Sequence, residues 1–529
     1  MLVHETEILI LALCVAIPLL SVLARVLQIP YPIVLVLGAI PLGYVPGVPD
    51  VVLHPDLVLV IFLPPLLYVA AFFADLRALR RDARVISLTT VGLVLLTTCT
   101  VAIVAHELMG ISWAIAFALG AIVSPTDPVA ATSIFRNLGA PRRLVNLVEG
   151  ESLVNDASAL IAYRVAVAAA VGGSFSFAEA TLDFFLAVFG GVGIGLIVGT
   201  VIAGIRRRLD DVPVEIILSI FSGYIAYFPA EQLGASGVLA AVTVGVQLGW
   251  LAPHISSPQM RLQGYAVWEL TVFVLNAVLF VLIGLQLPNI LDAVSGDDVG
   301  TLAGYAMATI AVVVGTRFLW SFTTPYAIRL LDRRASQVER RAPAALRIVF
   351  SWAGMRGAVS LAAALALPLE TDAGTPLPDR DLVIFLAYCV VLFTVVVEGL
   401  TLPALIRRLD VTDDGSEEAA EEHQARIAAA EAGIEALDRL AEEDWVRPAT
   451  VERMRGLLNF RRRRFATLRG DDEDDGIVDQ SLAYQRLVHE VIEAQRRAII
   501  DLRNRGEISA EVMRRVERDL DLEEERLEV

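Results

Sequence analysis

Residues 114–135 form the sequence AIAFALGAIVSPTDPVAATSIF, an apolar stretch with Asp127 near its middle, between Pro125 and Pro128. A stretch of this length and composition is typical of a membrane-spanning helix, but two prolines three residues apart remove backbone donors and break the helix. Broken helices are tolerated at membrane depth where they line a cavity or face protein. The freed carbonyl groups and nearby hydroxyl groups, such as that of Thr126, are then able to ligate a small cation. A proline kink with a capping aspartate is the alternative.

Similar apolar stretches recur along the chain from Ile8 to Ile406. Of the 529 residues, 56% are hydrophobic and the mean hydropathy is +0.63, which is more than the interior of a soluble domain accommodates. The stretches are long and do not alternate, so helices are expected rather than strands. About thirteen membrane-spanning helices are predicted, over residues 6–24, 30–46, 55–74, 85–105, 112–134, 144–171, 182–205, 213–230, 236–251, 264–286, 301–323, 346–369 and 381–406.

The arginines test this arrangement, because all 43 basic residues of the chain are arginine. With the N-terminus outside, twenty of them fall between helices on the cytoplasmic side, and one, Arg380, falls outside. This bias follows the positive-inside rule. We therefore expect a multi-pass protein of the cell membrane with its N-terminus outside and its C-terminal tail in the cytoplasm.

The composition changes near residue 411, which predicts a membrane domain over 1–410 and a helical cytoplasmic tail over 411–529. The tail contains 31 acidic residues and 19 arginines, and its helical segments are amphipathic. It is expected to be a regulatory or dimer-supporting domain, or else a solvated helical surface. The net charge of −17 argues against nucleic-acid binding. No cysteine or nucleotide-binding motif indicates a cofactor.

A second polar cluster follows in residues 144–168, LVNLVEGESLVNDASALIAYRVAVA. On a helix, Glu151 and Asn155 share a face and Asp156 lies next to it. A carboxylate beside a carboxamide makes an oxygen-rich site that suits Na⁺ or a similar ion. A carboxyl group held away from water without a cationic partner also takes up protons readily, so this site is able to exchange a proton for a cation. A polar contact between helices is the alternative.

A third interruption occurs in residues 346–368, LRIVFSWAGMRGAVSLAAALALP, where Gly354, Arg356 and Gly357 break an apolar run. Transporters often carry one broken helix in each of two inverted repeats. The predicted fold is therefore an all-α membrane protein with two inverted six-helix repeats around a linking seventh helix. The fifth and twelfth helices are discontinuous and cross each other.

Three arginines fall inside predicted helices, where an ionisable group costs about 2.5–3.5 kcal/mol or more. Arg317 is a candidate partner for Glu151 or another buried acid, the alternative being a side chain that reaches the membrane surface. Arg164 lies closer to the outer side and is expected to be structural, and the third is Arg356. Three glutamates near helix ends are expected to be solvated or to cap helices: Glu215, Glu269 and Glu398.

Four motifs together resemble the sodium/proton exchangers of the monovalent cation/proton antiporter superfamily. They are FLPPLLY, SPTDPVA, GESLVNDASAL and SWAGMRGAVSLA, and the resemblance covers roughly residues 10–408. The pair Asn155 and Asp156 is similar to the electroneutral branch of the superfamily, which exchanges one cation for one proton. The resemblance implies a homodimer in membrane lipid, with a dimerisation part and a six-helix core that moves like an elevator.

The resemblance also implies a role for each matching residue. Asp156 carries the ion or the proton, and Asp127 forms the site with the backbone of Thr126. Ser152 offers a hydroxyl ligand, and Asn155 stabilises the arrangement. These five residues make up the expected ion- and proton-binding site, and the two aspartates are the expected ligands of the transported monovalent cation.

Around this site, the resemblance implies that Glu151 pairs with Arg317. It places Arg356 near the crossing of the broken helices, where it offsets their carbonyl ends or Asp127. One position departs from some prokaryotic relatives, which carry a glutamate in the third helix. The stretch LPPLLYVAAFFAD has Val69 there, which leaves the preference among Na⁺, K⁺ and Li⁺ open.

The expected function is exchange of Na⁺, with K⁺ or Li⁺ as alternatives, for H⁺, in support of pH and cation homeostasis. A cation channel is a second possibility, but no filter-like carbonyl motif is present. An intramembrane enzyme is a third, but Ser152 has no histidine partner within the membrane, because His106 and His254 fall at helix ends. The chain is therefore not expected to be an enzyme.

Overall fold

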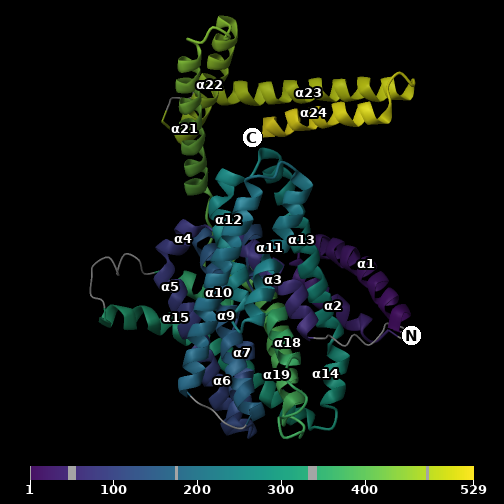
Figure 1. Cartoon of the computed structure of the whole chain (residues 1–529), viewed down its shortest axis with the longest axis vertical. Coiled ribbons are helices and arrows are strands. Elements are labelled where there is room, and N and C mark those ends of the chain that lie inside the picture. The colour runs from purple at the N-terminus through teal and green to yellow at the C-terminus, as the bar shows by residue number, and fades with distance from the viewer. Residues whose placement is uncertain (1, 46–54, 173–176, 332–341, 472–475, 529) are drawn as a thin grey trace. The chain divides into compact units, whose positions relative to one another are not determined.

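The computed structural model describes residues 2–45, 55–172, 177–331, 342–471 and 476–528. Within these ranges the regular structure is helical, apart from one isolated bridge between Glu370 and Pro376. The chain forms two compact units, Met1–Asp413 and Asp414–Val529 (Figure 1). We call them the N-terminal unit and the C-terminal unit and describe each by itself.

The N-terminal unit is a helical bundle in which two short segments, η1 and η2, are π-helical. Its first elements are α1 (Leu2–Leu27), α2 (Tyr31–Leu42), α3 (Pro55–Phe73), α4 (Leu76–Arg81), α5 (Ala83–Ser87), η1 (Leu88–Leu93), α6 (Val94–Met109), α7 (Trp113–Val123), α8 (Pro128–Leu138), α9 (Arg142–Gly172) and α10 (Phe177–Arg206). The remaining elements are α11 (Val212–Gln232), α12 (Gly237–Ile255), α13 (Pro258–Leu285), α14 (Leu287–Ala293), α15 (Val299–Leu331), α17 (Ala344–Trp352), α18 (Ala358–Leu365), α19 (Arg380–Phe393), η2 (Thr394–Glu398) and α20 (Gly399–Arg408).

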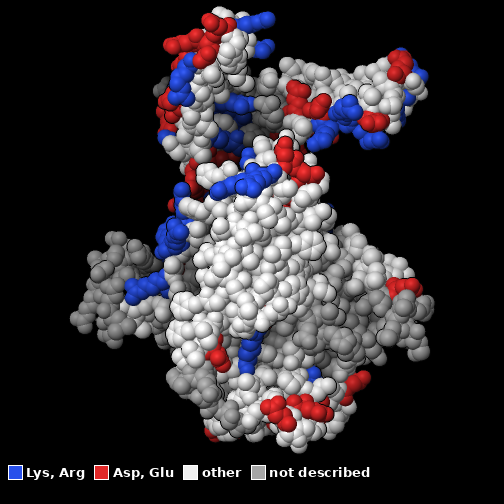
Figure 2. All heavy atoms as spheres, in the orientation of Figure 1, with Lys and Arg blue, Asp and Glu red and all other residues white. Residues whose placement is uncertain are grey.

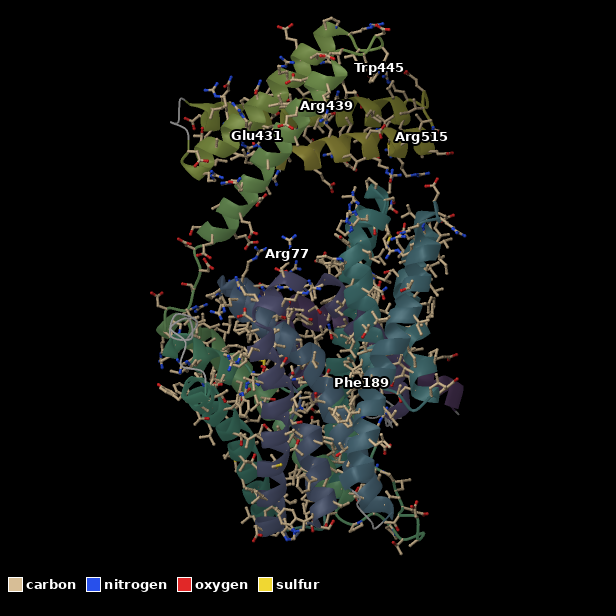
Figure 3. All side chains as sticks on the ribbon, turned by 60° about the vertical axis from the view of Figure 1, so that its left-hand side comes forward. Arg77, Phe189, Glu431, Arg439, Trp445 and Arg515 are labelled. Atoms are coloured by element: carbon tan, nitrogen blue, oxygen red, sulfur yellow. The ribbon has the colours of Figure 1, made fainter. Side chains whose placement is uncertain are left out.

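Ten helical runs among the described residues are long and apolar enough to cross a membrane. Two shorter apolar helices, Tyr31–Leu42 and Leu59–Phe73, accompany them. Uncharged side chains cover the middle of this unit on the face shown in Figure 2, and Phe189 of α10 lies exposed on the outer side of its helix (Figure 3). These features support a bundle of membrane-spanning helices; the count of thirteen stays a prediction.

Two of the predicted helices are interrupted in the structure. The helix expected over 112–134 consists of α7 and α8, separated at residues 124–127, and the helix expected over 346–369 consists of α17 and α18, separated at 353–357. The helix expected to begin at residue 264 begins earlier, at Pro258, because Ser257 caps it by accepting a hydrogen bond from the backbone of Met260. Hydropathy alone does not indicate such a cap. A serine followed by a proline in the sequence, in contrast, indicates the start of a helix.

Buried apolar side chains of the described N-terminal unit form four clusters. The largest includes residues of α2, α6, α7, α13, α15, α18 and α19. Another groups residues of α3, α10, α11 and α12 with Trp268 of α13. Gly245 and Gly249 of α12 lie directly against the backbone of α3, so close that a Cβ atom at Gly245 would overlap the carbonyl group of Tyr68. Small residues four apart are a common device for close helix packing in membranes.

The C-terminal unit consists of two helical hairpins. The first pairs α21 (Ser416–Leu440) with α22 (Pro448–Arg469), and the second pairs α23 (Ile477–Asn504) with α24 (Ala510–Glu528). Arg496 of α23 forms ion pairs with Asp521 (2.5 Å) and Glu524 (2.6 Å) of α24. Trp445, in the turn between α21 and α22, is exposed (Figure 3). The unit is helical, as expected of this tail, and its role stays a prediction.

The close packing of α3 and α12 gives a first prediction. We expect Gly245→Ala to lower the melting temperature of the detergent-solubilised protein, because the added methyl group overlaps the α3 backbone. Gly193→Ala in α10 is the matched control, since nothing lies within 4 Å of its added Cβ and alanine favours a helix by about 1 kcal/mol over glycine. If the two variants melt alike, the contact between α3 and α12 is not tight.

Candidate ion-binding site

The two interrupted helices meet at their breaks. The backbone N–H of Asp127, between α7 and α8, donates a hydrogen bond of 2.8 Å to the carbonyl oxygen of Met355, between α17 and α18. The next backbone N–H, of Arg356, donates to Thr394 Oγ1 at 3.0 Å. Each break exposes backbone groups that have no helical partner. One of these groups, the N–H of Asp127, finds its partner in the other break. The four half-helices α7, α8, α17 and α18 therefore contact one another at the crossing.

The aspartate at the crossing has two neighbours that constrain it. Asp127 Oδ1 accepts a hydrogen bond of 2.9 Å from the backbone of Val129 and so caps α8, as the alternative interpretation of the sequence predicted. A Cβ atom at Gly357 would overlap the Asp127 carboxylate, and one at Gly354 would overlap the side chain of Arg317. Glycine is required at both positions because charged side chains approach the backbone there.

Arg356 is buried and binds the carbonyl ends of the broken helices. Its Nε donates to the carbonyl oxygen of Val123 at 3.1 Å, and its Nη1 donates to that of Gly354. Val123 ends α7, so its carbonyl group is one that a helix end leaves without a partner, and Gly354 lies in the break between α17 and α18. The guanidinium group thus binds a carbonyl group at each break, in line with the first of the two roles that the resemblance implies for it.

Glu151 and Arg317 form a buried ion pair between α9 and α15. Arg317 Nη1 and Nη2 donate to the two carboxylate oxygens at 2.5 and 3.0 Å, and both side chains are 2% exposed. Arg317 Nη2 also donates to the carbonyl oxygen of Phe350 at 3.3 Å in α17. Thr126 Oγ1 donates to Glu151 at 3.3 Å and accepts from Asn155 Nδ2 at 2.8 Å. This network joins α9, α15, α17 and the break in α7–α8.

A cavity of about 1020 Å³ reaches this region. Thr126, Asp127, Ser152 and Asp156 all line it, together with Pro125, Pro128 and Gly357. Asn155 does not line the cavity, and its Nδ2 donates a hydrogen bond to Thr126 Oγ1. The structure thus brings four of the five predicted site residues to one cavity and gives the fifth a supporting contact.

Asp127 and Asp156 line the same cavity, and the charge of Asp127 acts on Asp156. Two carboxylates that share a site repel each other when both are ionised, and a proton or a cation between them relieves the repulsion. Thr126 and Ser152 add neutral oxygens at the same place. Carboxylate, hydroxyl and carbonyl oxygens are the ligands that hard cations prefer.

The cavity continues from the aspartates to a charged entrance. Arg136 and Glu149 form an ion pair there, with Arg136 Nη2 and Glu149 Oε1 3.0 Å apart and the Arg136 side chain 72% exposed. The other charged side chains along the cavity are those of Arg25, Asp75 and Glu269. Because Arg136 is exposed to solvent, the cavity links Asp156 to that surface.

The opposite wall of the cavity is mostly apolar. α3 contributes Val69 and Ala70, and α13 contributes Val272 and Phe273. At Val69 and Ala70, where the resemblance led us to look for a carboxylate, apolar side chains line the cavity instead. The candidate site depends on the oxygens of α9 and of the α7–α8 break.

Two of the three glutamates expected to be solvated or to cap helices are buried, so the expectation of solvation was wrong for Glu215 and Glu398. Glu215 is 3% exposed and accepts hydrogen bonds of 3.0 and 2.8 Å from Arg206, which also donates to Ser256. Glu398 is 1% exposed. Glu269, by contrast, is exposed at the cavity entrance. The pairing of Glu215 with Arg206 could have been predicted from the sequence, because these opposite charges flank the short turn between α10 and α11.

The chain is similar to known membrane transporters. The family model for the transmembrane sodium/hydrogen exchanger matches residues 9–408. An uncharacterized Na(+)/H(+) exchanger of Mycobacterium tuberculosis is 34% identical over 523 residues, which cover 98% of this chain and 96% of that protein. A sodium, potassium, lithium and rubidium/H(+) antiporter of Bacillus pumilus is 34% identical over 394 residues, which cover 72% of this chain and 58% of that protein.

The fold is similar to a solved structure. The sodium proton antiporter MjNhaP1 from Methanocaldococcus jannaschii superposes with a TM-score of 0.60 at 18% sequence identity, over 78% of this chain and 100% of that chain. At this identity the similarity concerns the fold alone, and it supports the helical antiporter fold.

The buried ion pair gives a second prediction. We expect Glu151→Gln to lower the melting temperature markedly, because removing one partner of a buried pair costs about 3–5 kcal/mol. Arg136→Gln is the control, since it removes an exposed pair with a typical contribution of about 0–1 kcal/mol. Thermal unfolding in detergent measures both. A Glu151→Gln protein as stable as Arg136→Gln would show that the pair does not hold α9 to α15.

Proposed function

The chain belongs to the sodium/hydrogen exchanger family, and on that premise we propose that it exchanges Na⁺ for H⁺ across a membrane, with Asp156 as the group that carries either ion. The observation that supports this most directly is the placement of Asp156 and Asp127 in one cavity beside the crossing of two broken helices. A family of antiporters transports ions and catalyses no covalent reaction, in agreement with the expectation that the chain is not an enzyme.

In the proposed exchange, Asp156 and Asp127 supply the charge of the site, and Thr126 and Ser152 supply neutral oxygen ligands. A bound Na⁺ relieves the repulsion between the two carboxylates. When the cation leaves, a proton takes its place on Asp156, since the pair is unfavourable while both members are ionised. The two ions compete for one carboxyl group, and this competition couples their movements.

We propose that the exchange is electroneutral, one Na⁺ for one H⁺. Glu151 is neutralised by Arg317, and position 155 is an asparagine that is turned toward Thr126 and away from the cavity. Asp156 is then the carboxyl group of α9 that titrates during exchange. An acidic residue at position 155 would add a second titrating carboxyl group to α9.

Alternating access is proposed to occur by an elevator-type movement. The cavity lies between α3 and α13 on one side and α8, α9 and α18 on the other, so sliding one wall past the other would move the site between two openings. The further proposals are a homodimer, two inverted repeats, thirteen membrane-spanning helices, the N-terminus outside the cell membrane, and a regulatory C-terminal unit in the cytoplasm.

K⁺ and Li⁺ are proposed as additional substrates. The Bacillus pumilus relative is named for sodium, potassium, lithium and rubidium. In this chain, Val69 and Ala70 leave the α3 side of the cavity without a charged ligand. A site with fewer protein ligands leaves more of the cation's hydration shell in place, which weakens selection by ion size.

The carrier role of Asp156 gives a third prediction. In proteoliposomes with an imposed proton gradient, wild-type protein is expected to dissipate the gradient when Na⁺ is added, as reported by dequenching of a pH-sensitive dye. Asp156→Asn is expected to lose this response, because the amide neither carries a proton nor neutralises a cation. Asp292→Asn, at an exposed acid in α14, is the control and is expected to exchange normally.

Size-exclusion chromatography of the same preparations separates loss of exchange from loss of folding. Sodium-dependent proton movement in a folded Asp156→Asn protein would remove this residue from the carrier role. Sodium-dependent current without proton coupling in the wild type would favour a channel.

Electroneutrality gives a fourth prediction. When a membrane potential of either sign is clamped across the proteoliposomes, the initial rate of Na⁺/H⁺ exchange is expected to stay the same, because no net charge crosses in one cycle. A rate that rises with one polarity and falls with the other would indicate that unequal charges are exchanged.

A further inference from the structure

Glu398 is a buried carboxyl group that the proposed exchange leaves without a role. It ends the π-helical segment η2, and its Oε2 atom has no hydrogen-bond partner within the described part of the chain. Taking a carboxylate out of water costs several kcal/mol unless a charge or hydrogen bonds compensate it. A buried, incompletely hydrogen-bonded glutamate therefore stays ionised only where a counter-charge lies nearby, and otherwise takes up a proton.

The π-helical segment turns two polar side chains toward the crossing. Thr394 begins η2 and Glu398 ends it, and both are buried. Thr394 Oγ1 accepts the hydrogen bond from the backbone of Arg356. Single π-helical turns are rare and occur frequently at functional sites. Here the turn places η2 directly against the residue that binds the carbonyl ends of both broken helices.

Arg356 is the candidate partner of Glu398, because its backbone is bound by Thr394 of the same π-helical segment. Of the two arginines whose charges act on Glu398, Arg356 acts the more strongly. Arg317, the other, already forms a bidentate pair with Glu151.

The helices packed against η2 add no other candidate close by. α2 contains no charged residue, α19 carries charges only in its first two residues, and α20 carries charges only in its last two.

We propose that Glu398 is the counter-charge of Arg356 and acts as a positioning residue for cation binding. With Glu398 ionised, Arg356 holds the carbonyl ends of the crossing without adding net positive charge beside Asp127 and Asp156. Without the negative charge of Glu398, the positive charge of Arg356 repels the transported cation and weakens its binding. The proposal rests on the exchange activity proposed above and adds a residue that determines its cation affinity.

Two substitutions separate charge from shape. Glu398→Gln keeps the shape and removes the charge, whereas Glu398→Asp keeps the charge and shortens the side chain. We expect Glu398→Gln to raise the half-saturating Na⁺ concentration about tenfold, the effect of one unit charge on the order of 10 Å away at an effective dielectric constant near 20. Glu398→Asp is expected to stay close to wild type, and the maximal rate is expected to change little in either variant.

Proteoliposome exchange at graded Na⁺ concentrations measures both parameters. An unchanged half-saturating concentration in Glu398→Gln overturns the proposal, and so does a larger loss in Glu398→Asp than in Glu398→Gln, because a purely structural role tolerates the isosteric change better. A wild-type protein without exchange would instead overturn the proposed function, so the two failures are distinguishable.

A double variant covers the case in which Glu398→Gln does not fold. Removing both charges, in Glu398→Gln with Arg356→Gln, eliminates the uncompensated guanidinium group. Arg356→Gln alone completes the double-mutant cycle, because it also loses the hydrogen bonds to the carbonyl groups of Val123 and Gly354. We expect the double variant to lose less thermal stability than the sum of the losses in the two single variants. Additive losses would show that the two charges do not compensate each other.

Discussion

A backbone hydrogen bond from Asp127 to Met355 joins the two breaks on which the rest of the structure depends. Inside a membrane, backbone groups released from a helix have no water to bind, so a break persists only where protein supplies partners. Here Met355 of one break accepts from Asp127 of the other, and the Arg356 side chain donates to the carbonyl groups of Val123 and Gly354. The same arrangement leaves Asp127 at the end of a half-helix, lining the same cavity as Asp156. The break in the helix therefore also positions one of the two aspartates of the proposed ion-binding site.

A network of buried hydrogen bonds ties the crossing to its neighbouring helices, whereas the cavity beside it is open. Glu151, Arg317 and Thr126 tie α9, α15 and the α7–α8 break to one another through buried hydrogen bonds. The wall formed by α3 and α13 meets the aspartates across the cavity with mainly apolar side chains. Few polar bonds therefore need to break when the two walls move relative to each other, which agrees with the proposed alternating access.

Much of this could be predicted from the sequence, because the strongest constraints are local. Pro125 and Pro128 fix the first break, and hydropathy fixes the depth of Asp156. What the sequence could not supply is the partner of each buried side chain, since that depends on which helices are neighbours. Glu398 lies near the end of a predicted helix, yet a π-helical turn directs it inward, and hydropathy takes no account of such a turn. Asn155 likewise faces Thr126 and not the cavity, a difference of orientation that helical spacing alone leaves open.

The two buried cations of the crossing region, Arg317 and Arg356, are both arginines. A guanidinium group keeps its proton at any pH that a cell meets, so these charges are permanent, and protonation changes in the crossing region fall on carboxyl groups. A buried lysine, in contrast, readily gives up its proton and would offer protons a second route that bypasses the cation. The chain contains no lysine. In the proposed exchange, a proton carried in the crossing region therefore rides on a carboxyl group, the same kind of group that binds the cation, and this limits slippage, the futile passage of one ion without the other.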